Sequence, residues 1–128
     1  MEKVRFQREY ILNVSRSILF NCLSTPSGMS EWFADDVNIK DDVFTFFWDS
    51  SEEQARLIAK KREEFVRFRW LELEDEGHEC FFELRIRIDA LTGETALIVT
   101  DYADEDELDE GKLLWDSQIE NLKRILGS

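Results

Sequence analysis

The 128-residue sequence is poor in the residues that most often carry chemistry. It has one histidine, His78, and two cysteines, Cys22 and Cys80. A lone histidine with no Cys-x-x-Cys pair makes neither a zinc site nor a convincing Cys–His dyad. Gly-x-Gly-x-x-Gly, phosphate-loop, Gly-x-Ser-x-Gly and His-Glu-x-x-His motifs are also missing, and with them the usual machinery for nucleotides and hydrolysis. We expect no catalytic residue, no metal ion and no cofactor.

The sequence also lacks a signal-peptide pattern and a long apolar run. Together with only two cysteines, this indicates a reducing, cytoplasmic location, with both thiols as small buried residues and a disulfide as the lesser alternative. Apolar runs are only a few residues long, far below the ~20 that cross a bilayer, so membrane insertion is not expected.

Positive charge is scarce. Sixteen Lys and Arg stand against 29 Asp and Glu, giving a formal net charge of −13 at pH 7. Such a field repels nucleic acid and anionic membrane surfaces, so we expect neither as a partner. Hydrophobic residues are nevertheless 43% of the chain, with 10 Phe and 4 Trp, which favours a single domain over residues 1–128 with an aromatic-rich core.

Alternation of apolar and polar residues predicts strands over most of the chain. The residues after position 51 are also rich in helix formers, so a helix over 52–64 is the alternative there. Turns are expected at Asp41-Asp42, at Glu74–Gly77 and at Thr92-Gly93. The predicted strands are residues 4–12, 37–39, 43–48, 55–60, 66–70, 80–88 and 95–102.

Three helices complete the pattern. Ser15 is placed to cap a short helix that stops at Ser24, and Pro26 to begin a second one that runs to Phe33. A long C-terminal helix to Leu126 carries an apolar stripe at three-to-four spacing, and the concave face of the sheet is the only large apolar surface that can cover it. We therefore predict an α+β helix-grip fold, a curved antiparallel sheet of about six to seven strands wrapped around that helix. Because the stripe is then committed to the sheet, a monomer is favoured.

Two segments resemble a known family. The sequence LSTPSGMSEWFADDV at residues 23–37 resembles the helix-pair signature of START-like (SRPBCC, helix-grip) proteins, in the branch related to activators of the heat-shock chaperone ATPase. The sequence WDSQIENLKRIL at residues 115–126 resembles the final helix of that branch. The chain differs from the branch at Asp41-Asp42, where a glycine pair often precedes the third strand. The resemblance implies a cavity between helix and sheet. Proteins of this superfamily bind lipids, hormones or polyketides, or contact partner proteins, so the fold leaves the function open.

The candidate walls of that cavity are apolar residues placed by strand or helix phase. The alternative is that they simply fill the interior. Polar anchors that strand phase can place inside are Arg8, Tyr10, Thr100 and Tyr102, and the plain alternative for Arg8 is pairing with a nearby carboxylate. The apolar candidates are Trp32, Phe33, Phe44, Phe46, Trp48, Phe68, Trp70, Phe82, Trp115 and Ile119.

Charged residues on the predicted outer face suggest a second kind of site. Arg67, Arg69, Arg85 and Arg87 share the phase that points away from the core, and form a candidate surface for a protein partner. Neutralisation by the neighbouring Glu83 and Glu72 through cross-strand pairs is the alternative. The acidic residues 101–110 lack the order of a calcium loop and are interpreted as a solvated helix start.

From the sequence we expect a non-enzymatic START-like domain that binds a small hydrophobic or amphipathic molecule. A protein-interaction or chaperone-regulating module with a filled core is the alternative. A cyclase-like or hydrolase-like enzyme in the same cavity is the third, less favoured interpretation.

Overall fold

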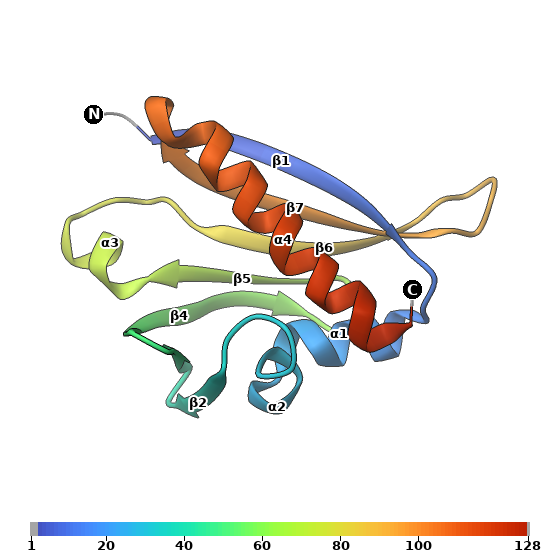
Figure 1. The fold of residues 1–128 in the computed structure, drawn as a ribbon, viewed down its shortest axis with the longest axis horizontal. Coiled ribbons are helices and arrows are strands. Elements are labelled where there is room, and N and C mark those ends of the chain that lie inside the picture. The colour runs from blue at the N-terminus through green and yellow to red at the C-terminus, as the bar shows by residue number, and fades with distance from the viewer. Residues whose placement is uncertain (1–2, 128) are drawn as a thin grey trace.

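One seven-stranded antiparallel sheet forms the body of the structure. The computed structural model describes residues 3–127, and within that range the strand order is β1-β7-β6-β5-β4-β3-β2. Figure 1 shows α4 lying diagonally across one face of the sheet. This confirms the predicted helix-grip architecture. The strands are β1 (Lys3–Leu12), β2 (Asp36–Lys40), β3 (Val43–Trp48), β4 (Ser51–Lys61), β5 (Phe65–Trp70), β6 (Phe82–Ile88) and β7 (Thr95–Asp104).

The two helices after β1 begin where the capping residues predict. The Ser15 hydroxyl accepts a hydrogen bond from the Ile18 N–H at the start of α1 (Arg16–Ser24). The Thr25 hydroxyl accepts one from the Gly28 N–H at the start of α2 (Pro26–Met29), where proline occupies the first turn. Each cap satisfies a backbone donor that the helix itself leaves unpaired.

The second helix is shorter than predicted. It ends at Met29 rather than Phe33, because the N–H groups of Glu31 and Trp32 bond only three residues back, to Gly28 and Met29, and that of Ala34 bonds five back, to Met29, so the regular helical pattern is lost. This segment carries Trp32 and Phe33 into the interior, where both are almost fully buried.

The middle of the chain holds one confirmed strand and one unpredicted helix. Residues 51–61 form β4, so the strand and not the helix is the correct interpretation; a register shift between Leu57 and Ala59 bulges this strand. A short α3 (Leu71–Asp75) follows β5 directly. Five residues with no apolar stripe give no periodic signal, so the sequence predicted only a turn here.

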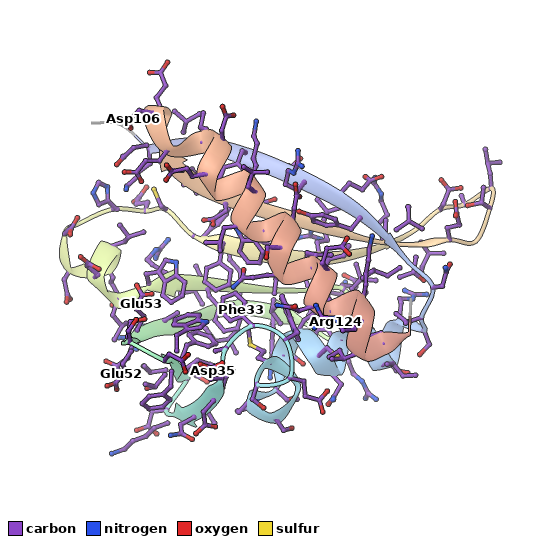
Figure 2. The ribbon with its side chains drawn as sticks, viewed as in Figure 1. Phe33, Asp35, Glu52, Glu53, Asp106 and Arg124 are labelled. Carbon is purple, nitrogen blue, oxygen red and sulfur yellow. The ribbon has the colours of Figure 1, made fainter. Side chains whose placement is uncertain are left out.

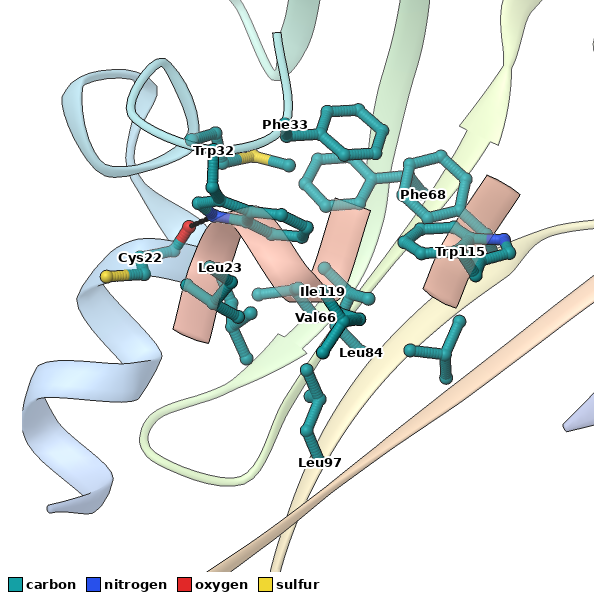
Figure 3. Close-up of a cluster of buried hydrophobic side chains, with 14 of the residues drawn as sticks. Cys22, Leu23, Trp32, Phe33, Val66, Phe68, Leu84, Leu97, Trp115 and Ile119 are labelled. Carbon is teal, nitrogen blue, oxygen red and sulfur yellow. Dashed lines mark hydrogen bonds between the residues drawn. The ribbon is translucent and has the colours of Figure 1, made fainter. Parts of the chain in front are cut away.

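The core lies between α4 (Leu108–Leu126) and the concave face of the sheet. Trp115, Ile119 and Leu122 project from α4 into it, and Figure 3 shows the first two among side chains of the sheet. Gly127 ends the helix in a left-handed conformation, with φ 73°. Of the described helices, none is long and apolar enough to cross a membrane.

Candidate functional site

The centre of the interior is filled by aromatic rings. Phe44, Phe46, Phe68 and Phe82 are fully buried, and the Phe68 and Phe82 rings stack with centroids 5.1 Å apart. Ile119 covers them from α4 and is also fully buried. These five candidates are therefore core residues in this structure, and the open space lies elsewhere.

A pocket of about 390 Å³ lies beside this core, between α4 and the end of the sheet where β3 turns into β4. Four of its walls are aromatic, and all four belong to the candidate set from the sequence. Leu114 stands at its rim and is 60% exposed. The lining residues are Phe33, Trp48, Ser51, Glu53, Trp70, Asp101, Leu114, Trp115 and Gln118.

Each aromatic wall comes from a different part of the fold. Phe33 follows α2 and stacks on Trp115 of α4, with ring centroids 5.8 Å apart. Trp48, the last residue of β3, donates its indole N–H to the Phe33 carbonyl at 3.0 Å. Trp70 is the last residue of β5, and its ring packs on the Phe82 ring with centroids 5.1 Å apart. The filled core therefore packs directly against this wall of the pocket.

Asp101 is a half-buried carboxylate in the lining of the pocket, and the sequence analysis missed it. Its side chain accepts hydrogen bonds from the Trp115 indole N–H at 2.8 Å and from the Tyr102 backbone N–H at 2.7 Å. Both donors are neutral, and no arginine or lysine of residues 3–127 forms a salt bridge with this carboxylate. Burial consequently raises the pKa of Asp101 from 3.8 to about 6.

The phase of β7 explains this omission. Leu97, Val99 and Asp101 alternate on the concave face, whereas Thr100 bonds to Gln7 at 3.0 Å on the opposite face, and Tyr102 contacts Phe81 there. The expectation that Thr100 and Tyr102 point inward is therefore wrong. Asp101 belongs to the strand and not to the solvated acidic segment.

Arg8 and Tyr10 lie on the other long side of α4, away from the pocket. Both bind Asp116: Arg8 Nη2 lies 2.6 Å from one carboxylate oxygen, and the Tyr10 hydroxyl donates to the other at 2.6 Å. These bonds lower the pKa of Asp116. The pairing alternative for Arg8 is the one that the structure shows.

Trp32 lines a neighbouring hollow of about 370 Å³, which shares Phe33, Trp48, Leu114 and Gln118 with the pocket. Its indole N–H donates to the Cys22 carbonyl at 2.8 Å, as Figure 3 shows, and the residue is 4% exposed. Trp32 thus anchors the segment that carries Phe33.

The four arginines of the outer face are already bonded. Arg67 and Arg85 both bind Glu83, at 2.6 and 3.0 Å, while Arg69 donates to the Cys80 carbonyl and Arg87 pairs with Glu9. Burial alone would raise the pKa of Glu83, but the two guanidinium bonds outweigh it and lower that pKa. Glu83 therefore pairs with both Arg67 and Arg85, and its single negative charge offsets one of their two positive charges.

Of the acidic residues that precede α4, residues 105–107 are exposed and Asp104 is half-buried. Carboxylates of Asp104, Asp106 and Glu107 come within 4.8 Å of one another, and Lys3 pairs with Asp104 at 3.3 Å. Figure 2 shows Asp106 at the far end of α4 from Arg124. These side chains do not line the pocket.

Comparison with known proteins places this architecture in a family. A family model described as a START-like superfamily domain matches residues 1–128, and the chain belongs to that superfamily. The BfR322 protein of Bacteroides fragilis, solved by NMR, is 40% identical, with a TM-score of 0.68 over 98% of this chain and 92% of its own.

More distant structures share the fold. The Aha1 dimer of Colwellia psychrerythraea is 12% identical, with a TM-score of 0.80 over 96% of each chain. DynU16, described as a putative protein in the dynemicin biosynthetic locus, is 16% identical with a TM-score of 0.80, over 97% of this chain and 47% of its own. No curated protein sequence matches this chain.

Proposed function

We propose that this START-like domain binds a small hydrophobic or amphipathic molecule in the pocket between α4 and the β3–β4 end of the sheet. The observation that carries the proposal is the wall of Phe33, Trp48, Trp70 and Trp115 around about 390 Å³ of open space. Small-molecule sites in proteins are concave, mainly apolar and aromatic, and of a few hundred to about 1,000 Å³.

The filled core restricts this site to one end of the helix-to-sheet interface. Phe68 and Phe82 occupy the space under the middle of α4, so a long lipid chain has no continuous tunnel beneath the helix. The ligand is therefore a compact molecule, and its apolar part contacts the three tryptophans and Leu114.

The four indole N–H groups give a direct test. In a ¹⁵N-labelled sample titrated with 1-octanol, we expect the resonances of Trp48, Trp70 and Trp115 to shift in a saturable way. Trp32 is the internal reference: the Cys22 carbonyl holds its indole N–H, and only its contact with Phe33, with ring centroids 5.3 Å apart, links it to the pocket, so its shift should be the smallest of the four. Shifts confined to residues outside the pocket, or none up to the solubility limit of octanol and its aromatic analogue benzyl alcohol, would contradict the proposal.

A further inference from the structure

The charged residues around the pocket are of one sign. Glu53 and Asp101 line it, and none of the described lining residues is Lys, Arg or His. Glu53 comes from β4 and Asp101 from β7, and Figure 2 shows Glu53 beside the β3–β4 end of the sheet. A ligand carboxylate or phosphate would meet two carboxylates in this lining, while Lys3, which attracts Asp101 from outside the lining, is paired with Asp104.

Three of the five side chains that carry hydrogen-bond donors in the lining are committed to the protein. The Trp48 N–H serves the Phe33 carbonyl, the Trp115 N–H serves Asp101, and the Gln118 side-chain amide donates to the Phe33 carbonyl at 3.4 Å. These three groups leave a guest acceptor oxygen and aromatic surface, and the Trp70 indole N–H and the Ser51 hydroxyl are the other side-chain donors of the lining. Each carboxylate oxygen of Asp101 accepts one bond from the protein and retains a lone pair for another donor.

Aromatic rings complement the carboxylates. An ammonium ion over the face of Trp, Tyr or Phe is attracted by the negative potential of the ring, and Trp is the best of these three partners. The pocket has three tryptophans and one phenylalanine within its lining. A desolvated carboxylate beside aromatic rings is a favourable environment for an organic cation, whereas a strongly hydrated inorganic cation gains little from such walls.

The surroundings extend the same field. A hollow of about 720 Å³ adjoins the pocket through Glu53 and Trp70, and its lining adds Glu52, Glu72 and Asp75 against a single cation, Lys3, which pairs with Asp104. On the other side, the hollow below Trp32 adds Glu31 and Asp35. Clefts lined by one sign of charge concentrate ligands of the opposite sign.

We infer that the pocket selects an organic ammonium ion, a protonated or methylated amine that carries an apolar group. The inference rests on the proposed function and names the class of its ligand. The ammonium group lies between Asp101 and Glu53 against the tryptophans, and the apolar group extends past Phe33 toward Leu114. Burial raises the pKa of Asp101 to about 6, so near neutral pH this carboxylate is ionised but poorly solvated, and a bound cation compensates for the lost hydration.

The test compares ligands that share one chain and differ in the head group. Octyltrimethylammonium, octylamine, 1-octanol and octanoate are titrated at pH 7.5 and low salt, below their micelle concentrations, with the same tryptophan resonances as the readout. We expect both cations to bind about tenfold more tightly than octanol, and octanoate to bind most weakly. Added salt should weaken the cations and leave octanol unchanged.

Two substitutions assign the preference to the pocket. Asp101→Asn and Glu53→Gln keep the size of each side chain and should each reduce cation affinity about three- to tenfold, and octanol affinity by a clearly smaller factor. Glu110→Gln removes the same charge from an exposed position of α4 outside the pocket and serves as the matched control. It should leave both affinities unchanged.

The outcomes separate the two proposals. If octanol or octanoate binds as tightly as the cations, or if the preference survives in the Asp101→Asn, Glu53→Gln double variant, the ammonium inference is overturned and the apolar pocket stands. If no head group moves the pocket tryptophans, both proposals fail.

Discussion

An aspartate lies along each of the two long sides of α4, and the two carboxylates have different partners. Toward β1, Asp116 is held by Arg8 and Tyr10, and the helix is tied to the sheet by charge-assisted bonds. Toward β3 and β4, Asp101 has only neutral donors and faces open space. One side is closed by its own residues and the other is left with an unneutralised charge. The Asp116 contact therefore holds the helix on the sheet, whereas Asp101 belongs to the candidate binding site.

The largest effect on the free energy of unfolding should come from removing Phe82, whose ring packs against the aromatic walls of the pocket. Phe82 is fully buried and contacts Phe33, Phe68, Trp70 and Trp115. Phe82→Ala should lower the free energy of unfolding by about 3–5 kcal/mol, measured by urea denaturation, because the packed rings cannot close the cavity. A loss in the free energy of unfolding below about 1 kcal/mol would mean that the rings around Phe82 move to fill the cavity. Phe82→Leu, which keeps most of the volume, should lose less.

Asp101→Asn should have the opposite sign. The folded-state pKa is raised, from 3.8 to about 6, so the native state binds the proton more tightly, and wild-type stability falls as pH rises through that window. The raised pKa corresponds to about 3 kcal/mol, and losing the Tyr102 N–H bond offsets about 1 kcal/mol, leaving a gain near 2 kcal/mol at pH 7.

The measurement is urea denaturation of wild type and Asp101→Asn at a series of pH values from 3.5 to 7.5. Lys3 attracts the Asp101 carboxylate and lowers its pKa, so the variant also loses this attraction, which acts against the expected gain. By the same values, the variant should be about 1 kcal/mol less stable than wild type at pH 3.5, where only the lost hydrogen bond counts, and about 2 kcal/mol more stable above pH 6. A variant that is less stable than wild type at pH 7 would contradict the assignment.

Asp116→Asn tests the closed side and should show a smaller, reversed effect. The pKa of Asp116 is lowered by Arg8 and Tyr10, so its contribution is complete above 3.8 and is lost as pH falls through the lower folded-state value. Arg8 and Asp116 are 37% and 33% exposed, so solvent screening limits the expected loss to about 1 kcal/mol at pH 7. Asp109→Asn, on an exposed position of the same helix, is the control. Equal losses in the two variants would exclude a closing role for Asp116.

The smallest effect on stability should come from the rim. Leu114→Ser removes an exposed side chain and should change the free energy of unfolding by less than about 0.5 kcal/mol. It should nevertheless weaken octanol binding several-fold, because Leu114 lines the pocket. Leu113→Ser is the matched control: Leu113 is 67% exposed on the same helix and does not line the pocket. Equal affinities of the two variants would remove Leu114 from the site.

The fold could be predicted because its signals are local and repeated. Alternation identifies strands such as β5 and β6, capping residues locate α1 and the start of α2, and the stripe from Trp115 to Leu122 predicts a helix that covers a sheet. Helix α3 escaped prediction because its backbone is set by the chain reversal after Trp70 and not by any apolar period.

The site could be predicted only in part. Phe33, Trp48, Trp70 and Trp115 were among the candidates, but phase alone does not distinguish Phe68 from Trp70, which lie on the same face of β5. Phe68 is fully buried and Trp70 lines the pocket, because α4 covers the middle of the sheet more closely than its end.

Asp101 was missed for a different reason. Residues 96–99 are apolar on both faces of β7, so their alternation carries no information about which side is inward. Only the pairing with β1 and β6 determines the phase, and pairing depends on residues far away in the sequence.

The packed core beside the pocket also determines how the pocket exchanges water. A volume of about 390 Å³ corresponds to about a dozen molecules at the density of the liquid. Because stacked rings cannot move inward around a small guest, a guest that is too short leaves part of that volume hydrated. Each added methylene should then release more solvent and make the heat capacity change of binding more negative, with a gain of about 0.8 kcal/mol, until the volume is full. The packing of Phe33, Phe82 and Trp115 would thus make affinity depend on the length of the ligand.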